Sequence, residues 1–461
     1  MKFSSLGFAP EIQQAIEACG YSEMTPIQEQ AIVAARRGKD LLASAQTGTG
    51  KTAAFALPIL QQMLDKPQAT ESLQPRALIL TPTRELAEQL ADTIGAYAQF
   101  LPLSVTALYG GVKLGGQTSK LKNGVDVLIS TPGRLLEHLT LCNVNLAGVE
   151  FVVLDEADRM LDMGFILDVQ KIMQHTAKKR QTLLFSATIS AAVNELAHKI
   201  LHNHTEIRAT KLNATAETVD HVVYPVEERR KIDLFIELFE EYNWYQVLVF
   251  TSTKEQADKL MANLKLGKVN AAVCHGDKNQ GARRRAIADF KSAKLQVLIA
   301  TEVAARGLDI QGLDYVINFN LPYLPEDYVH RIGRTGRAGK SGHAISFVSR
   351  EEERTLDRIQ RLIGSKIRRI VRAGFEVSNR ESLLNTVSRR NRPSHANKAT
   401  ETHINREKAV NTSNKKPKSR RANAVAPTPA SGKPRSTTSS PRGKTGGAKT
   451  MGKSGRGKSG K

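Results

Sequence analysis

The chain has 461 residues, of which 40% are hydrophobic, and it carries a formal net charge of +22. This length allows two or three domains with apolar cores, whereas three cysteines without a CxxC pair argue against a disulfide framework or a zinc site. Since no run of about 18 apolar residues and no apolar leader occur, we expect neither export nor membrane spanning and predict a cytoplasmic protein.

Short apolar runs rich in β-branched residues alternate with longer helical patterns along most of the chain. This alternation is typical of an α/β fold with parallel sheets. The strands predicted in the first half are residues 40–45, 77–81, 126–131, 151–154 and 182–185. After a polar stretch at residues 203–218, the strands predicted in the second half are residues 247–250, 271–274, 297–301, 315–318 and 344–348. Residues 351–371 follow as a predicted basic helix that packs on the second domain.

These patterns divide the chain into four segments. We predict a first α/β domain at residues 1–205, a linker at 206–217, a second α/β domain at 218–373 and a tail at 374–461. Only the first of the two domains contains a Gly-Lys-Thr loop.

The tail is strongly basic. From Arg380 onward it holds 21 Lys or Arg, three acidic residues and no Phe, Tyr or Trp, so it carries 18 of the 22 net charges. This composition predicts disorder, because little apolar surface is available to offset the entropy lost on ordering. A basic arm suits a polyanion such as nucleic acid, and a solubilising segment or a membrane-surface anchor is the alternative.

A phosphate-binding loop is predicted after the first strand. The loop reads Ala45-Gln46-Thr47-Gly48-Thr49-Gly50-Lys51-Thr52, with Ala45 where the general pattern has glycine. Its backbone N–H groups and the following helix N-terminus suit phosphates. We expect Lys51 to reach the terminal phosphates and Thr52 to offer an oxygen to Mg²⁺.

An acidic tetrad adds carboxylates for metal binding and for activation of water, which the loop does not contain. Asp155-Glu156-Ala157-Asp158 closes the predicted strand at residues 151–154. Asp155 can hold the hydration shell of the metal, and Glu156 can orient and deprotonate an attacking water. The loop and the tetrad together predict ATP hydrolysis. Because both follow strands of a parallel sheet, as does Ser186-Ala187-Thr188, we expect all three segments at one edge of the sheet.

Further motifs accompany the loop and the tetrad in a fixed order. They are Pro82-Thr83-Arg84-Glu85-Leu86-Ala87, Thr131-Pro132-Gly133-Arg134, Ala304-Ala305-Arg306-Gly307-Leu308-Asp309 and His330-Arg331-Ile332-Gly333-Arg334-Thr335-Gly336-Arg337. With them, the chain resembles a DEAD-box RNA helicase from about Phe3 to Val371. The resemblance implies two tandem RecA-like domains joined by a short linker. Met160-Leu161-Asp162-Met163-Gly164-Phe165 and Gln280-Gly281-Ala282-Arg283 are most similar to the bacterial RhlE-type branch.

The segment Thr25-Pro26-Ile27-Gln28 has two interpretations. It is a good helix start, with Thr as the N-cap, Pro at the first position and Gln at the third. The family resemblance instead implies the Q motif, in which Gln28 reads the adenine edge, Tyr21 stacks on the ring and Phe3 is the upstream aromatic. The second interpretation implies a preference for ATP over GTP.

Two arginines of the second domain also have two interpretations. Arg334 and Arg337 could be a solvated basic pair, but two such cations could also stabilise charge on the γ-phosphate. The resemblance implies this arginine-finger role, with Asp309 on the ribose, so hydrolysis should require closure of the two domains. It further implies coupling roles for Asp158, Ser186, Thr188 and His330. A polar strand end that makes a turn is the alternative for Ser186 and Thr188.

The resemblance also implies contacts to the RNA backbone, which carry no base-sequence information. The matching positions are Arg84, Gly111, Thr131 and Arg134 in the first domain, and Phe250, Gly276, Arg283, Thr301 and Gly307 in the second.

The function implied is that of an ATP-dependent RNA helicase with a monomeric core. It would couple hydrolysis of ATP, with Mg²⁺, to local unwinding or remodelling of short RNA duplexes and RNA–protein complexes. Ribosomal precursors or the RNA-degradation machinery are the expected partners, which implies ribosome biogenesis or RNA turnover. Two alternatives stay open: an RNA chaperone whose tail anneals strands while ATP controls release, and a DNA-directed helicase.

Overall fold

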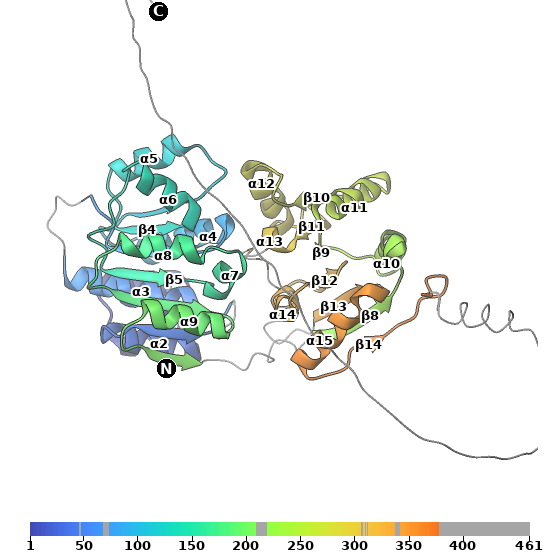
Figure 1. Cartoon of the computed structure of the whole chain (residues 1–461), viewed down its shortest axis with the longest axis horizontal. Helices are drawn as coiled ribbons and strands as arrows, with labels where there is room; N and C mark the ends of the chain where they lie inside the picture. Colours follow the sequence, from blue (N-terminus) through green and yellow to red (C-terminus); the bar gives the residue numbers. More distant parts are fainter. Residues whose placement is uncertain are drawn as a thin grey trace, which may run out of the picture. The chain divides into compact units, whose positions relative to one another are not determined.

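The computed structural model describes residues 1–45, 48–67, 73–208, 219–305, 308, 310, 312–336 and 342–377. Within these residues the chain forms two seven-stranded sheets, one in each half, and every strand pairing in them is parallel. Helices cover both faces of each sheet (Figure 1). The predicted fold class, two tandem parallel-sheet domains, is therefore confirmed; the predicted disorder of the tail concerns residues outside this part of the chain.

The first sheet has the strand order β3-β4-β2-β5-β6-β1-β7. Its strands are β1 (Leu41–Ser44), β2 (Ala77–Leu80), β3 (Val105–Leu108), β4 (Val127–Ser130), β5 (Phe151–Leu154), β6 (Gln181–Ser186) and β7 (Thr205–Arg208). The helices around it are η1 (Phe3–Leu6), α1 (Pro10–Ala18), α2 (Pro26–Arg36), α3 (Lys51–Asp65), α4 (Arg84–Tyr97), α5 (Leu114–Lys122), α6 (Pro132–Thr140), α7 (Ala157–Asp162), α8 (Ile166–Gln174) and α9 (Ala191–Ile200).

Apolar residues on both faces of the strands build two cores. Successive side chains of a strand point to opposite faces, so Leu41 and Ala43 pack among α1 to α4 while Leu42 packs among α6 to α9. Strands buried on both faces read as continuous apolar runs, which is why they could be predicted.

The second sheet has the strand order β10-β11-β9-β12-β13-β8-β14. Its strands are β8 (Val219–Pro225), β9 (Val247–Thr251), β10 (Ala271–Cys274), β11 (Val297–Thr301), β12 (Tyr315–Asn318), β13 (Gly342–Val348) and β14 (Arg368–Arg369). The helices around it are η3 (Glu228–Arg230), α10 (Lys231–Glu241), α11 (Lys254–Leu266), α12 (Gln280–Lys291), α13 (Glu302–Ala305), α14 (Pro325–Ile332), η4 (Arg350–Glu352) and α15 (Glu353–Ile363).

Three boundaries differ from the predicted ones. Strand β7 pairs with β1 up to Arg208, so the first domain extends three residues into the predicted linker. The predicted basic helix ends at Ile363, because Gly364 adopts a left-handed conformation with φ of +74° that terminates α15. Phe375 is buried in the second core, with the Arg230 guanidinium 4.2 Å from its ring centre, so the second domain extends beyond residue 373.

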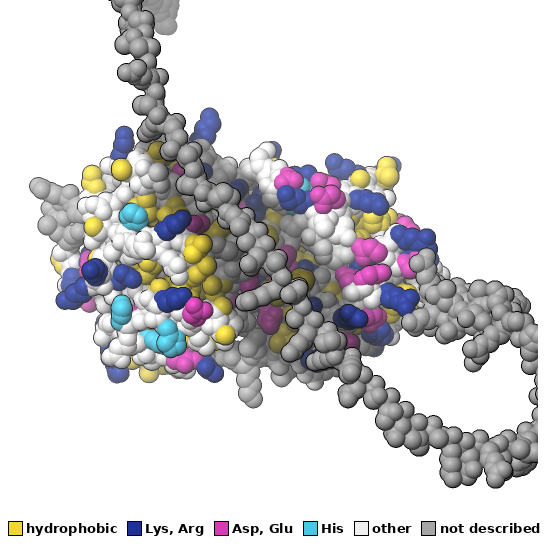
Figure 2. All heavy atoms as spheres, in the orientation of Figure 1, with side chains coloured by type: hydrophobic (Ala, Val, Ile, Leu, Met, Phe, Trp, Pro, Cys, Tyr) yellow, Lys and Arg dark blue, Asp and Glu magenta, His cyan; other side chains and the backbone are white. Residues whose placement is uncertain are grey.

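The face of the molecule drawn in Figure 2 is mixed in charge. Figure 2 shows Lys and Arg interspersed with Asp and Glu on the visible face. Residues 1–379 hold only a small share of the net charge, since most of it lies from Arg380 onward. None of the helices seen in the structure has the length and apolar character needed to cross a bilayer.

Candidate functional site

The three predicted functional segments lie on neighbouring strands. In the first sheet β5, β6 and β1 are adjacent, and the tetrad, Ser186-Ala187-Thr188 and the phosphate loop follow their carboxyl ends. The structure therefore brings them to the same edge, as predicted. In open parallel sheets this edge is where ligands bind.

The phosphate loop needs glycine for its shape. Gly48 and Gly50 have φ of +80° and +87°, and Gly50 is the N-cap of α3. A side chain at Gly50 would also collide with the Gln28 amide. Helix α3 thus begins at Lys51 with its N-terminus at the loop, where backbone N–H groups and the helix dipole favour an anion. Gln46 and Thr47 lie outside the described residues.

Lys51 presents a buried positive charge to this site. Its side chain is 7% exposed, and Nζ lies 3.8 Å from Asp155 Oδ1. Among the described residues Nζ has no hydrogen-bond acceptor. Since buried ammonium groups are otherwise hydrogen-bonded, this geometry indicates a site for an anionic ligand.

Asp155 and Glu156 end β5 in a confined environment. Burial raises the pKa of Asp155 to about 6, and the nearby Lys51 ammonium opposes this shift. Glu156 has a left-handed backbone, with φ of +56°, and caps α7. No group of three or more His, Cys, Asp or Glu in the described part of the chain is arranged to hold a metal. The hydroxyl of Thr52 and the carboxylate of Asp155 nevertheless fit Mg²⁺, which takes few protein ligands and completes its shell with phosphate oxygens and water.

These residues line a cavity of about 300 Å³, which we call the phosphate-loop cavity. Its wall consists of Tyr21, Gly48, Gly50, Lys51, Thr52, Leu86, Gln89, Thr93, Tyr97, Asp155, Glu156, Leu308 and Arg334. Arg334 comes from the second half of the chain, and its Nη1 donates to the Leu308 carbonyl at 2.5 Å. Arg334 and Lys51 therefore line one cavity, while the arginine-finger role stays a prediction. Asp309 and Arg337 lie outside the described residues.

Aromatic side chains form one end of the phosphate-loop cavity. Tyr21 is 38% exposed, and its ring stacks on buried Phe3 with centroids 6.1 Å apart. Its hydroxyl lies 3.2 Å from the hydroxyl of Tyr97 on α4. This half-exposed ring is available for stacking on a planar group.

Gln28 makes the helix cap and also contacts the phosphate loop. Its Oε1 accepts from the Thr25 backbone N–H at 2.8 Å, which completes a capping box with Thr25. Its Nε2 donates to the Gly50 carbonyl at 3.1 Å, and the Thr25 hydroxyl donates to the Thr49 carbonyl at 2.8 Å. The capping interpretation is thus observed, and the cap is tied to the loop; the adenine contact of Gln28 stays a prediction. Ala45 is buried behind the loop, and its N–H donates to the Ser186 carbonyl at 3.0 Å.

The tetrad contacts the segment after β6 through Thr188. Both the backbone N–H and the hydroxyl of Thr188 donate to Asp158 Oδ2, at 3.1 and 3.0 Å. Ser186 does not share this contact, because its hydroxyl donates to the Thr188 carbonyl at 2.6 Å. Of the two predicted coupling residues after β6, Thr188 therefore contacts Asp158 and Ser186 does not. His330, on α14, has a buried Nδ1 without a hydrogen-bond partner in the described part of the chain.

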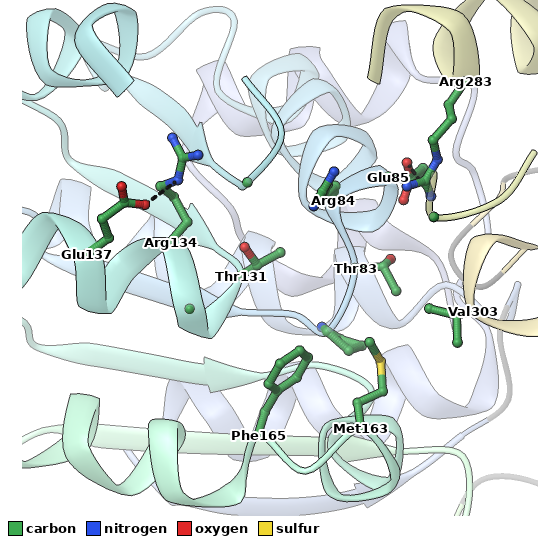
Figure 3. A pocket seen from close by; sticks show the side chains of 14 residues that line it. Thr83, Arg84, Glu85, Thr131, Arg134, Glu137, Met163, Phe165, Arg283 and Val303 are labelled. Carbon is green, nitrogen blue, oxygen red and sulfur yellow. Dashed lines mark ion pairs between the residues drawn. The ribbon is translucent and has the colours of Figure 1, made fainter. Parts of the chain in front are cut away.

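A second cavity, of about 410 Å³, surrounds the start of α4, and we call it the Arg84 groove (Figure 3). The residues that line it are Pro82, Thr83, Arg84, Glu85, Gly110, Thr131, Gly133, Arg134, Glu137, Met163, Phe165, Gly276, Arg283 and Val303. Gly111 adjoins it with φ of +80°, and a side chain there would collide with the Arg84 guanidinium. Arg84, Thr131 and Arg134 thus lie together, as the sequence prediction requires.

The RNA-contact residues predicted in the second half do not all lie at one cavity. Gly276 and Arg283 line the Arg84 groove, but Arg283 Nη2 is ion-paired with Glu85 Oε1 at 2.8 Å. Gly276 and Thr301 line a neighbouring cavity. The Phe250 side chain is 2% exposed, and the Arg331 guanidinium lies 4.9 Å from its ring centre. The ring is therefore part of the core, and the RNA contact predicted at Phe250 stays a prediction. Gly307 lies outside the described residues.

Comparisons with known proteins agree with this geometry. The family model for the DEAD/DEAH box helicase matches residues 25–196, and the model for the helicase conserved C-terminal domain matches residues 230–339. The ATP-dependent RNA helicase RhlB of Pseudomonas syringae pv. tomato is 41% identical over 371 residues, which cover 79% of this chain and 94% of that protein. The chain belongs to the DEAD-box ATP-dependent RNA helicase family.

Two further similarities extend over both halves of this DEAD-box helicase. The DEAD-box ATP-dependent RNA helicase CshA of Geobacillus kaustophilus is 38% identical over 87% of this chain and 86% of its own length. The structure of Saccharomyces cerevisiae Dbp5 bound to RNA and ADP BeF3 superimposes with a TM-score of 0.72 at 30% identity, covering 84% of this chain and 99% of that chain. Members of the family are RNA-stimulated ATP hydrolases.

The sequence did not reveal several residues of this DEAD-box helicase that line or support the two cavities. Leu86, Gln89, Thr93 and Tyr97 recur at three- and four-residue spacing along α4, which puts them on one helix face. That spacing in the sequence could have predicted that these four side chains lie on the same face of the helix. Glu85 gives no such signal, because its partners Arg283 and Gln280, the latter donating at 3.0 Å, are about 200 residues away.

Proposed function

We propose that this DEAD-box RNA helicase separates short RNA duplexes locally, with ATP hydrolysis at the phosphate-loop cavity. The observation that carries the proposal is the arrangement of Lys51, Asp155 and Arg334 around one cavity. Lys51 offers a buried cation to an anion, while Arg334 faces the same space from the other half of the chain. Two cations on opposite sides of a terminal phosphate stabilise the charge that develops there during phosphoryl transfer.

Mg²⁺ and two acidic side chains complete the proposed chemistry. Thr52 and Asp155 would hold the ion, which would neutralise charge on the phosphates when bound. Glu156 would orient the attacking water and accept its proton. Tyr21 and Gln28 would contact the base of ATP, with Gln28 giving up at least one of its present hydrogen bonds to do so.

The proposed RNA site includes the Arg84 groove. Arg84, Thr131 and Arg134 offer donors to phosphate and sugar oxygens, and Gly111 allows close backbone approach. Such contacts support binding without base specificity. Thr188 and Asp158 would transmit the state of the nucleotide to this groove, since their two hydrogen bonds join α7 to the segment after β6.

The cellular assignments are also proposals. We infer a cytoplasmic enzyme with a monomeric core that acts in ribosome assembly or RNA turnover, and we keep the RhlE-type branch as a prediction. The similar proteins named above are RhlB, CshA and Dbp5, so they give no particular support to that branch. The basic tail would add RNA affinity through counterion release, with a marked dependence on salt.

The experiment that tests the proposal is displacement of a labelled strand from a short RNA duplex. The protein as isolated should separate the strands with ATP, and Glu156→Gln should bind ATP but release no strand. Glu195→Gln is the matched control, because Glu195 is exposed and, in the part of the chain that the structure describes, its ion pair is with Lys199 on the same helix. The proposal is overturned if Glu156→Gln separates strands as fast as the unchanged protein. Annealing that needs neither ATP nor Glu156 would instead support the RNA-chaperone alternative.

A further inference from the structure

A buried hydrogen-bond network lies behind the Arg84 groove and is centred on Gln117. Gln117 belongs to α5, is 6% exposed, and contacts neither cavity directly. Its Nε2 donates to the Tyr109 carbonyl at 3.0 Å. Its Oε1 accepts from Arg134 Nη1 at 3.1 Å and lies 3.2 Å from His138 Nε2. One amide thus joins the loop after β3 to two residues of α6.

The donors and acceptors of this network fix the orientation of the Gln117 amide and the tautomer of His138. The Tyr109 carbonyl can only accept, so the Gln117 nitrogen must face it and the oxygen must face Arg134 and His138. His138 then carries its proton on Nε2, and Nδ1 accepts from Asn143 Nδ2 at 3.3 Å. Because His138 is fully buried, this neutral tautomer gives both of its ring nitrogens a hydrogen-bond partner.

This network holds the Arg134 guanidinium through hydrogen bonds to Val112 and Gln117. The Val112 carbonyl accepts from both Nη1 and Nη2 at 3.2 Å, and Gln117 takes the second Nη1 hydrogen. Glu137 Oε2 lies 3.1 Å from Nε. In the described part of the chain the second Nη2 hydrogen has no acceptor, while the side chain lines the Arg84 groove (Figure 3). The guanidinium is therefore oriented before any ligand binds, which lowers the entropy cost of a phosphate contact.

The same network holds the loop that carries Gly110 and Gly111. Its two ends are fixed by the Tyr109 and Val112 carbonyls, through Gln117 and Arg134. Arg84 packs against this loop, because a side chain at either glycine would lie within 4 Å of its guanidinium. Arg134, Arg84 and the glycine loop are thereby one unit with a common support.

We infer that Gln117 is a positioning residue for RNA binding, which holds Arg134 and the Tyr109–Val112 loop in the geometry that backbone phosphates require, with His138 fixing its amide. The inference rests on the proposed RNA role of the Arg84 groove. Gln117 acts through Arg134 and the loop and touches no ligand itself. Loss of its amide should therefore weaken RNA binding without changing how ATP binds.

The test is RNA-stimulated ATP hydrolysis by the full chain, titrated with single-stranded polyuridylate. Gln117→Met fills the same volume without hydrogen bonds, and Gln117→Ala is the second variant. Loss of one charge-assisted hydrogen bond corresponds to about a tenfold rise in the RNA concentration for half-maximal activity. The KM for ATP at saturating RNA should stay within about twofold. Gln99→Ala is the matched control, since Gln99 is exposed on the same half and its side-chain hydrogen bond among the described residues goes to the Ala96 carbonyl, within its own segment.

A double-mutant cycle separates this role from a general loss of packing. With Arg134→Ala already present, Gln117→Met should raise the half-saturating RNA concentration by less than about twofold, because the residue it positions is gone. His138→Leu should act in the same direction as Gln117→Met and add little to it. Independent, multiplying effects of Gln117→Met and Arg134→Ala overturn the inference.

The remaining outcomes distinguish this inference from the proposed function. If Arg134→Ala weakens RNA stimulation but both Gln117 variants behave like the unchanged protein, only the positioning role of Gln117 is wrong. If polyuridylate does not stimulate the unchanged protein, the proposed function fails and the inference fails with it. A Gln117 variant that raises the KM for ATP as much as the RNA requirement also overturns the inference, because its effect then reaches beyond the groove.

Discussion

Lys51 Nζ lies 3.8 Å from Asp155 Oδ1, and both side chains are buried at the edge of the first sheet. The distance is too long for a hydrogen bond, so the two charges flank the site without neutralising each other completely. Burial keeps the pKa of Asp155 raised to about 6 in spite of the Lys51 ammonium. The pair is thus arranged for a bound anion and cation more than for its own stability.

Lys51→Ala should abolish ATP turnover. The change removes a preorganised cation from the terminal phosphate, a loss that typically lowers kcat by about 100- to 1,000-fold. Steady-state phosphate release is the measurement. Lys66→Ala is the control, because Lys66 is exposed at the end of the same helix. A Lys51→Ala protein that retains more than about a tenth of the rate would contradict the assignment.

Gln28→Ala should affect both stability and nucleotide choice. It removes the capping box of α2 and the tie to Gly50, which should cost about 1 kcal/mol in the free energy of unfolding. It should also raise the KM for ATP and reduce the preference for ATP over GTP. Competition between the two nucleotides in the ATPase assay checks this outcome. Gln30→Ala, on the exposed side of α2, should change neither property; loss of stability with unchanged preference would leave capping as the only role of Gln28.

Thr188→Val should uncouple hydrolysis from strand separation. The substitution keeps the shape and the backbone N–H contact to Asp158 but removes the hydroxyl contact at 3.0 Å. We expect ATP hydrolysis within about threefold of the unchanged enzyme and a fall of about tenfold in duplex separation per ATP consumed. Measuring both rates in one reaction gives this ratio directly. Thr140→Val, an exposed site on α6, is the control, and equal losses in both rates would refute coupling through Thr188.

His138 should make the first domain less stable in acid. Burial, and to a smaller degree the Arg134 charge, lower the pKa of His138 in the folded protein. The unfolded state, with a pKa of about 6.5, then binds a proton that the folded state rejects. The stability contributed by neutral His138 is complete above that value and is lost as the pH falls below it, by up to about 1.4 kcal/mol per pH unit.

Urea unfolding at about pH 7.5 and about pH 5.5 measures this effect. His138→Gln should show a smaller loss of stability between the two pH values than the unchanged protein. His175→Gln, at an exposed position of the same half, should not. Since Asp155 titrates in both proteins, its contribution cancels in the difference. Identical pH dependence for the unchanged protein and His138→Gln would show that His138 does not contribute.

The sequence predicted most strands of both sheets but missed β3, β7, β8 and β14. β1, β2, β4, β5 and β6 are apolar runs that the interior of a parallel sheet requires. β3 is only partly buried along most of its length, and β7 and β8 contain exposed charged residues. None of these three strands is therefore a continuous apolar run that the sequence pattern would predict. The end of α15 depended on one glycine, Gly364, whose left-handed conformation outweighed the helical pattern that continues beyond it.

The site residues also fall into two groups, those in short motifs that the sequence predicts and those that it does not. The residues proposed to contact phosphate or metal belong to short motifs, because loop geometry fixes their spacing, and the sequence therefore pointed to them. The residues that position these groups make contacts between segments that are far apart in the sequence. Gln117 meets His138 across 21 positions, and Tyr21 meets Tyr97 across 76, so no local pattern connects them. The buried side chain of Phe250 shows the converse, since a motif position does not reveal whether the ring or the backbone is accessible.

The most direct test of the account is ATP hydrolysis by the full chain with and without single-stranded RNA, compared with DNA of the same sequence. Since residues from both halves of the chain line the phosphate-loop cavity, we expect RNA to raise the rate at least about tenfold, which corresponds to about 1.4 kcal/mol in the activation free energy. DNA should raise it much less, because it lacks the 2′-hydroxyl. Hydrolysis at the same rate with and without RNA would contradict the central claim that this helicase couples ATP to RNA.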